Sequence, residues 1–226
     1  MSLDRVSVVT PVFNRPDLVV EAVESVLDQA GVEVEVVVVD DGSTDDTPEV
    51  VDRLARDPRV RALHQPNRGP AAARNAGVAV CSAPWLTFLD SDDLMLSGRL
   101  RRQLDVLADT SRASAVIGLG RIQVDPGVEL PVEIAGRAPD DREASPYTIS
   151  MLLARSLFDE LGGFDESLRV AEDSDFHARL VAAGHRVHKL DEPLFVRRIT
   201  GDNLIYGIDH RREMFDLIRR RRPGAG

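Results

Sequence analysis

Residues 34–40, VEVVVVD, form a nearly continuous run of valines that ends in an aspartate and opens the polar turn DGSTDDT at residues 41–47. A strand that is apolar on both faces is typical of the buried interior of a parallel sheet. A similar run, VSVVTPVF, precedes it at residues 6–13, and apolar residues with helical spacing lie between the two runs. We expect Asp17 to cap this helix and Gly31 to end it. The sequence therefore predicts a strand, helix and strand in parallel arrangement.

The same alternation continues as far as residue 93. It predicts a helix over about residues 48–56, a strand at 60–65, a loop and an alanine-rich helix over 66–81, and a strand at 85–90. This order predicts an α/β fold with a Rossmann-like, mainly parallel central sheet flanked by helices. In such a sheet the ligand crevice lies at the carboxyl ends of the strands.

The second half of the chain is less regular. We predict helices at residues 99–109 and 172–184, a strand at 115–124, and one or two strands within 185–199. We predict that residues 149–163 form a strand or ordered segment that leads into a short helix. The tail is expected to be helical over about residues 209–220.

No linker divides the chain, so we expect a single domain over residues 1–226. We divide it at about residue 93 into a first half that carries the predicted ligand crevice and a second half, about 94–226. The polar segment 125–146, with four prolines, is expected to be a flexible loop or to contact substrate.

Composition excludes several classes of protein. The chain has 28 basic and 38 acidic residues, a net charge of −10, which argues against a nucleic-acid binder. Cys81 is the only cysteine, so a cysteine-built zinc site and an intrachain disulfide are excluded, and we expect a reducing, cytoplasmic location. The sequence has no apolar run of about 18 residues, so no transmembrane segment is expected.

The acidic run at residues 90–93, DSDD, directly follows the strand predicted at 85–90. Carboxylates this close repel one another unless a positive charge lies among them. Hard oxygen ligands at Asp90 and Asp92 suit Mg²⁺ or Mn²⁺. The alternative is that Asp90 or Asp93 caps a helix that follows Leu94.

Six motifs occur in an order that resembles glycosyltransferase family 2. They cover about residues 5–200 and read VSVVTPVFNRPDLVVEAVESVL, VVVVDDGSTDDT, NRGPAAARNAGV, WLTFLDSDD, GGFDESL and EDSDFHARL. The resemblance implies the GT-A fold and transfer of a sugar from a nucleotide diphosphate to an acceptor hydroxyl. It also implies inversion at the anomeric carbon and a divalent metal ion, Mn²⁺ or Mg²⁺. The first half of the chain, about 1–93, would then bind the nucleotide sugar, and the second half, about 94–226, would face the acceptor, with the loop 125–146 gripping it.

Several residues of these motifs are candidates for binding the nucleotide. Asp41 could accept a hydrogen bond from the N–H of a uracil or thymine ring, or the turn could bond only its own backbone. The resemblance implies that Asp41 contacts the base, that Pro11 and Phe13 line the base pocket, and that Gly69 lets the backbone pass close to the donor. UDP- or dTDP-sugars are thus favoured, with guanine left open.

Arginines and aspartates complete the expected donor site. Arg68 and Arg74 could meet diphosphate oxygens bidentately, or could lie on the surface or fix a helix. The resemblance implies that Asp92 is a direct metal ligand and that Asp90 contacts the donor ribose or the metal.

The catalytic candidates lie in AEDSD, residues 171–175. An inverting displacement needs a general base for the acceptor hydroxyl. The resemblance implies that Asp173 is this base and that Glu172 supports it. The alternative is a helix whose first turn collects acids to suit its dipole. Asp165 is either a sugar contact or a cap.

One position departs from the family pattern. Many relatives carry a histidine after the last core strand, and Ile199, which cannot bind a metal, stands near that position. Asp202, Asn203 or His210 could substitute for it, or the metal could bind more weakly.

Two other functions stay open. A degenerate family member would bind a nucleotide sugar or a protein without turnover, and a nucleotidyltransferase would share the acidic pair but need a glycine-rich phosphate loop, which TPVFNRPD is not. The arginines at residues 219–222 could touch an anionic membrane surface. The sugar, the acceptor and the oligomeric state are not encoded in any motif.

Overall fold

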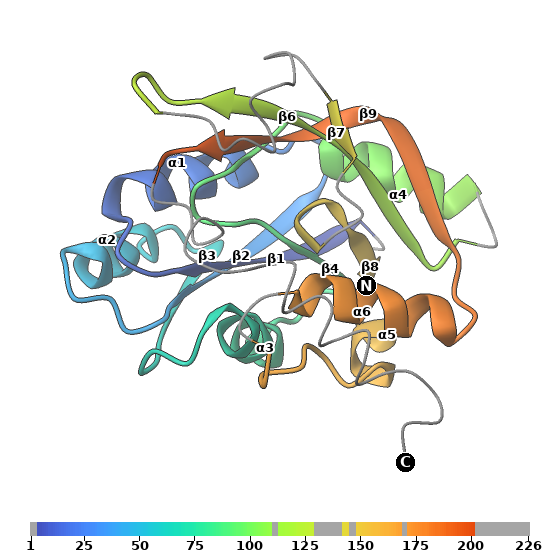
Figure 1. Cartoon of the computed structure of the whole chain (residues 1–226), viewed down its shortest axis with the longest axis horizontal. Helices are drawn as coiled ribbons and strands as arrows, with labels where there is room; N and C mark the ends of the chain where they lie inside the picture. The colour runs from blue at the N-terminus through green and yellow to red at the C-terminus, as the bar shows by residue number, and fades with distance from the viewer. Residues whose placement is uncertain (1–3, 110–112, 129–141, 145–147, 169–170, 202–226) are drawn as a thin grey trace.

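The computed structural model describes residues 4–109, 113–128, 142–144, 148–168 and 171–201. Within these residues nine strands form one mixed sheet in the order β3-β2-β1-β4-β8-β6-β9-β5, with β7 paired to β6 (Figure 1). The predicted tail helix, residues 202, 203 and 210, the arginines at 219–222 and most of the predicted loop 125–146 lie outside the described residues.

The first half of the sheet is parallel, as predicted. Its strands are β1 (Arg5–Val12), β2 (Glu33–Asp40), β3 (Val60–His64) and β4 (Trp85–Phe88). The helices between them are α1 (Pro16–Leu27), α2 (Thr47–Leu54) and α3 (Pro70–Val80). Val12 of β1 pairs with Asp40 of β2, and Val9 pairs with Phe88 of β4. This register brings the turns that follow β1, β2 and β4 to one edge of the sheet.

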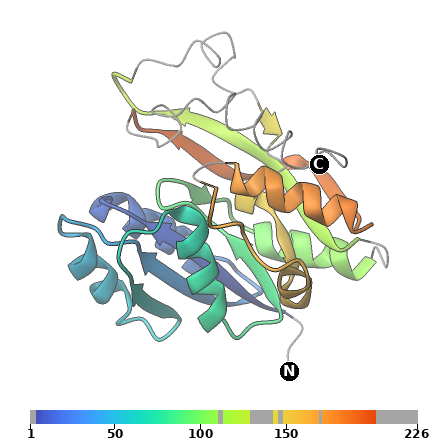
Figure 2. The ribbon, with the colours of Figure 1, turned by 60° about the horizontal axis from the view of Figure 1, so that its bottom comes forward.

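The second half adds antiparallel pairs and one long parallel pair. Its strands are β5 (Leu94–Met95), β6 (Ala115–Val124), β7 (Arg142–Ala144), β8 (Leu152–Ala154) and β9 (Val187–Ile199). Its helices are α4 (Arg99–Asp109), the 3-10 turn η1 (Thr148–Ser150), α5 (Arg155–Glu160) and α6 (Glu172–Ala182). In Figure 2 the first half gathers on one side, in blue to teal, and β6, β9, α4 and α6 gather on the other.

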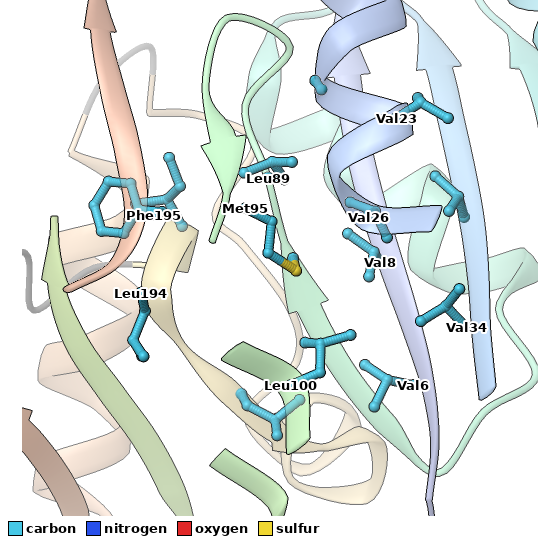
Figure 3. Close-up of a cluster of buried hydrophobic side chains, with 14 of the residues drawn as sticks. Val6, Val8, Val23, Val26, Val34, Leu89, Met95, Leu100, Leu194 and Phe195 are labelled. Carbon is cyan, nitrogen blue, oxygen red and sulfur yellow. The ribbon is translucent and has the colours of Figure 1, made fainter. Parts of the chain in front are cut away.

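Two hydrophobic clusters cover the two faces of the sheet. Side chains of α1, α2 and α4 pack on one face, and side chains of α3, α5 and α6 pack on the other. Figure 3 shows the first cluster, in which Val8, Val26, Leu89 and Met95 lie close together. Leu89 is fully buried in this cluster, which fixes the position of the chain where the acidic turn at residues 90–93 begins.

Helix α3 approaches the sheet closely at Gly77. A Cβ atom on Gly77 would lie 2.4 Å from Cγ1 of Val9 and 3.1 Å from Cγ2 of Val39. The missing side chain therefore lets α3 lie directly against β1 and β2.

The prediction that Asp17 caps α1 is wrong. The N-cap residue of α1 is Arg15, no side chain caps it, and Pro16 begins the helix. Asp17 lies in the first turn, where an acid suits the positive end of the helix dipole. The backbone N–H of Arg15 donates a hydrogen bond to Oγ1 of Thr47, the first residue of α2, at 2.9 Å.

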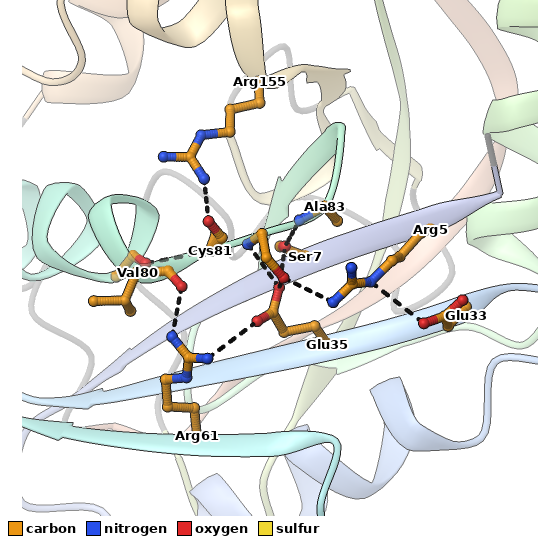
Figure 4. A network of polar contacts seen from close by, with 11 residues as sticks. Arg5, Ser7, Glu33, Glu35, Arg61, Val80, Cys81, Ala83 and Arg155 are labelled. Atoms are coloured by element: carbon orange, nitrogen blue, oxygen red, sulfur yellow. Dashed lines mark hydrogen bonds and ion pairs between the residues drawn. The ribbon is translucent and has the colours of Figure 1, made fainter. Parts of the chain in front are cut away.

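A polar network surrounds Glu35 near the amino ends of the parallel strands (Figure 4). One oxygen of Glu35 accepts hydrogen bonds from Ser7 Oγ at 2.7 Å, Ser82 N at 2.9 Å and Ser82 Oγ at 3.0 Å. Arg61 lies 3.9 Å from the other oxygen. Burial opposes ionisation, but these hydrogen bonds, together with the nearby charge of Arg5, outweigh it and lower the pKa of Glu35 below its ordinary value.

We therefore expect Glu35→Gln to reduce the free energy of unfolding by about 1–2 kcal/mol at neutral pH. Because the pKa of Glu35 is lower in the folded state, its carboxylate contributes full stability above its ordinary pKa of 4.5. That contribution is lost as the pH falls further, so the difference from wild type should shrink below that value. Urea unfolding over a pH series measures this difference. Glu33→Gln, at an exposed neighbour paired with Arg5, is the matched control, and a difference for Glu35→Gln that does not change with pH would contradict the assignment.

Candidate active site

Three carboxylates gather in the turn after β4. Ligand atoms of Asp90, Asp92 and Asp93 all lie within 4.8 Å of one another. Asp93 is buried, and its burial together with the charges of Asp92 and Asp90 raises its pKa well above the ordinary value. Three hard oxygen donors this close together have the chemistry to hold a divalent cation.

Neither Asp90 nor Asp93 caps a helix. The turn leads into β5, and α4 begins only at Arg99. Asp93 Oδ1 instead accepts a hydrogen bond from the backbone N–H of Arg198 at 2.9 Å, and Arg198 Nε donates to the carbonyl of Asp92 at 2.6 Å. The capping alternative is therefore wrong, and the acidic turn is fastened to β9.

Two arginines that no motif marks as site residues, Arg15 and Arg198, both reach this turn. Arg15 Nη1 lies 3.4 Å from Asp92 Oδ2 and 3.4 Å from Thr200 Oγ1. Arg198 also contacts Glu21 of α1 with its guanidinium. Their positions in NRPD and VRRI carry no distinctive signal, because surface arginines are common at the ends of helices and strands. Ile199, beside Arg198, is buried, so its side chain offers nothing to a ligand.

Asp41 organises the start of α3. Its Oδ1 accepts hydrogen bonds from Gln65 Nε2 at 2.7 Å and Arg68 N at 2.9 Å, and its Oδ2 accepts one from Gly69 N at 2.8 Å. Asp41 is buried. Gly69 itself has a φ of 89°, and a Cβ there would meet nothing within 4 Å. The contact of Asp41 with a base stays a prediction, and its binding of the 65–69 loop is the role visible in the structure.

The two turns that carry Phe13 and Asp41 are joined. Asp41 N donates to the carbonyl of Val12 at 2.9 Å, and Asn14 N donates to Ser43 Oγ at 2.9 Å. Phe13 is 40% exposed, so its ring is accessible at the sheet edge beside Asp41. Pro11 is partly buried in β1. These positions are compatible with an aromatic wall for a flat ring, which stays a prediction.

The two candidate arginines differ sharply. Arg68 is exposed and pairs with Glu166 at 2.7 Å. Arg74 is buried, and donates from Nη2 to Asp90 Oδ1 and from Nη1 to Glu172 Oε1, each at 2.6 Å. Burial alone would lower the pKa of Arg74, but the charges of Asp90, Asp173 and Glu172 raise it above its ordinary value. Arg74 therefore holds a permanent charge among the acidic residues.

Glu172 and Asp173 begin α6, as predicted. Glu172 is buried against Arg74, whereas the side chain of Asp173 is 26% exposed, and its Oδ1 lies 4.0 Å from Arg74 Nη1. Ala171, the N-cap residue, has a φ of 66°, a left-handed conformation that is uncommon for alanine. Of the two acids, Asp173 is the one that a substrate can reach. The acids also suit the helix dipole, so both interpretations of this turn hold together.

The GGFDESL loop is fixed next to these residues. The Asn75 side chain exchanges two hydrogen bonds with the backbone of Phe164, each at 2.9 Å, and also donates to Glu166. Arg179 of α6 donates to the carbonyl of Gly163 at 2.6 Å. Asp165 accepts bonds from Ser167 N and Oγ at 3.0 and 2.7 Å, so it forms a local turn. A sugar contact for Asp165 stays a prediction.

The structure thus brings five predicted site residues to one edge of the sheet. They are the metal candidates, the catalytic pair and the arginine between them: Asp90, Asp92, Glu172, Asp173 and Arg74. Asp90, Glu172 and Asp173, from two distant segments, meet at the Arg74 guanidinium, and Asp92 lies beside Asp90. This arrangement is suited to binding a phosphate ligand through a metal next to a proton acceptor.

Comparisons with solved structures define the class of fold. Staphylococcus aureus TarS 1–349 in complex with UDP-GlcNAc superposes with a TM-score of 0.73 at 20% sequence identity, over 95% of this chain and 64% of that one. Mannosyltransferase PcManGT from Pyrobaculum calidifontis, in complex with GDP-Man and Mn²⁺, gives 0.69 at 23% identity, over 88% of this chain and 58% of that one. The chain therefore has the GT-A fold, and the fold prediction is confirmed.

Sequence comparisons then identify the family. The model described as Glycosyl transferase family 2 matches residues 7–171. Succinoglycan biosynthesis protein ExoO of Rhizobium meliloti is 36% identical over 198 residues, which cover 80% of this chain and 57% of the relative. Succinoglycan biosynthesis protein ExoU of the same organism is 32% identical over 218 residues, covering 88% and 63%. The chain belongs to glycosyltransferase family 2. It spans less than two thirds of the length of these two relatives.

Proposed function

We propose that the chain transfers a sugar from a nucleotide diphosphate sugar to an acceptor hydroxyl, with inversion and with the help of a divalent metal. The observation that carries the proposal is that Arg74 joins Asp90, which lies in one acidic turn with Asp92, to Glu172 and Asp173 at the start of α6. The acidic turn has the chemistry of a metal site, and Asp173 offers an accessible carboxylate 4.0 Å from the same guanidinium.

Each group has a defined task in this proposal. Asp92 and Asp90 would hold Mn²⁺ or Mg²⁺, which when bound offsets negative charge on a diphosphate leaving group. Asp173 accepts the proton of the acceptor hydroxyl, which makes that oxygen a better nucleophile. Glu172 keeps the first turn of α6 in place through Arg74. The exposed Arg68 is available to the diphosphate once it leaves Glu166.

We infer that the donor carries uracil or thymine. Asp41 accepts three hydrogen bonds, and a carboxylate has about four acceptor positions, so one position is left for the N–H of such a base. The TarS complexes support a uridine nucleotide, whereas the PcManGT complex contains GDP-Man, so guanine stays the competing base.

The setting of the reaction is also a proposal. We place it in the cytoplasm, because the single cysteine, Cys81, is buried and forms no disulfide within the chain. In the part of the chain that the structure describes, no helix has the length and apolar character needed to cross a bilayer. The acceptor is a hydroxyl compound whose class is left to screening.

Calorimetric titration with UDP, dTDP and GDP, each with Mn²⁺ and with EDTA, tests the proposal. We expect one diphosphate to bind at least about tenfold more tightly with Mn²⁺ than with EDTA, since the metal bridges the acidic turn and the phosphates. That result selects the donor sugars to be tested for turnover. Equal binding with and without metal would contradict the metal role of the turn.

A binding protein without turnover is the second candidate. The buried Ile199 favours it, since this side chain cannot supply the late metal contact that the resemblance implies for many relatives. Metal-dependent hydrolysis of a nucleotide sugar by the wild-type protein would exclude this candidate. Metal-dependent binding without any hydrolysis or transfer would support it.

A further inference from the structure

The guanidinium of Arg74 joins two segments that are far apart in the sequence. Its Nη2 donates to Asp90 in the acidic turn after β4, and its Nη1 donates to Glu172 at the start of α6, each at 2.6 Å. We propose that Arg74 is a positioning residue that holds the proposed base, Asp173, in a fixed place relative to the donor-binding turn, and that it does not bind the diphosphate. This inference rests on the proposed function.

The contacts of Arg74 leave little for a ligand. The residue is 5% exposed, and both terminal nitrogens already donate to carboxylates in short, charge-assisted bonds. Its Nε is buried without a hydrogen-bond partner among the described residues, and the ring of Phe164 lies 5.9 Å from its Cζ. A phosphate would have to displace one of two short ion pairs, the buried one with Glu172 or the one with Asp90, whose side chain is 40% exposed. Arg68, with a side chain 59% exposed, has no such obstacle.

Arg74 stands on a rigid support. Asp41 fixes the start of α3 through the N–H groups of Arg68 and Gly69, and Gly77 lets the same helix pack directly on β1. A guanidinium that projects from such a helix can define the position of its partners, because the helix does not move to follow them. The positions of the acidic turn and of α6 are therefore both set relative to α3.

The first turn of α6 needs stabilising contacts from other parts of the chain. Ala171 adopts a left-handed conformation immediately before Glu172, which costs energy for a residue with a Cβ. Glu172 is buried, and its bond to Arg74 is one of the contacts that hold this first turn in place. Asp173 follows in the same turn. Loss of Arg74 would leave Glu172 buried without a cation and would let the turn, and the base on it, shift.

Measuring both turnover and diphosphate affinity distinguishes a positioning role of Arg74 from a phosphate-binding role. We expect Arg74→Met to reduce kcat for nucleotide-sugar hydrolysis by about 100-fold, since small displacements of reacting groups have effects of this size. The Kd of UDP with Mn²⁺ should change less than about threefold, because in this proposal Arg74 makes no contact with the diphosphate. GDP replaces UDP as the probe if the wild-type titration selects it. A Kd that weakens as much as kcat/KM falls would overturn the inference.

Two further variants keep the test independent of folding defects. Arg74→Lys retains the charge but cannot bridge both carboxylates, so we expect it to recover only part of the lost kcat. In a double variant, Arg74→Met with Glu172→Gln, no buried charge is left unpaired. We expect its kcat to equal that of Glu172→Gln alone, since the two residues act together. Multiplicative losses in the double variant would overturn the inference.

The matched control is Arg61→Met. Arg61 also contacts α3, through the carbonyl of Val80 at 2.7 Å, but at the end away from the acidic turn. Its kcat and Kd should stay at wild-type values. Absence of turnover in the wild-type protein would contradict the proposed function and this inference together, whereas normal turnover in Arg74→Met would overturn this inference alone.

Discussion

Asp173→Asn is expected to reduce turnover of a nucleotide sugar by about 10³-fold or more, while leaving the unfolding temperature close to that of wild type. The amide keeps the size of the side chain but cannot take a proton from the acceptor hydroxyl. The side chain of Asp173 is 26% exposed and lies 4.0 Å from Arg74, so the substitution keeps the size of a partly exposed side chain. Release of the nucleoside diphosphate, followed with a coupled assay, measures the effect.

The affinity for UDP with Mn²⁺ should be retained in Asp173→Asn, because the proposed base does not contact the diphosphate. Asp191→Asn, at a side chain that is 93% exposed on β9, is the control for removing an acid. A variant at Asp173 that keeps more than about a tenth of wild-type turnover would rule out this residue as the general base.

Asp92→Asn is expected to abolish metal-dependent binding of the diphosphate as well as turnover. An amide oxygen is a weaker ligand than a carboxylate, and the remaining carboxylates, Asp90 and Asp93, hold too little accessible charge to compensate. We expect the Kd of UDP with Mn²⁺ to rise by about 100-fold, to the value that wild type shows in EDTA. Calorimetry with and without EDTA on both proteins makes this comparison.

Asp57→Asn is a suitable control for this variant, since Asp57 is an aspartate paired with Arg59 on the surface after α2. In Asp92→Asn the effect of EDTA should disappear, because the site that EDTA empties has already been lost. If EDTA still weakened UDP binding in the variant, the metal would be held elsewhere in the chain.

Much of the fold could be predicted because its signals are local and periodic. The valine runs became β1 and β2, and the helix predicted at residues 99–109 has those bounds as α4. The short strands β5 and β7 were not predicted, because two or three residues show no period. The cap of α1 was missed for a different reason: the helix begins at Pro16, so Asp17 lies inside its first turn. The N-cap residue, Arg15, is held by a hydrogen bond to Thr47 at the start of α2.

The acidic residues of the site could be predicted from the sequence, but the contacts between them and the arginines could not. Aspartates after predicted strands mark the carboxyl edge of a parallel sheet, and so Asp90 and Asp92 were found. The sequence could not tell Arg68 from Arg74, because both lie in one motif and differ only in burial and partners. Arg198 was missed because its contact with the acidic turn depends on the long β6–β9 pairing, which no local pattern reports.

The bonds that complete the site join residues very far apart along the chain. Arg74 and Glu172 are separated by 98 positions, Arg198 and Asp93 by 105, and Arg198 and Glu21 by 177. Contacts of this kind carry the largest loop-closure entropy and form slowly during folding. The parallel core of the first half can thus assemble from closer neighbours, and the active site becomes complete only after β9 has been synthesised and docked. Partially folded forms of the chain would hold a sheet without a working site.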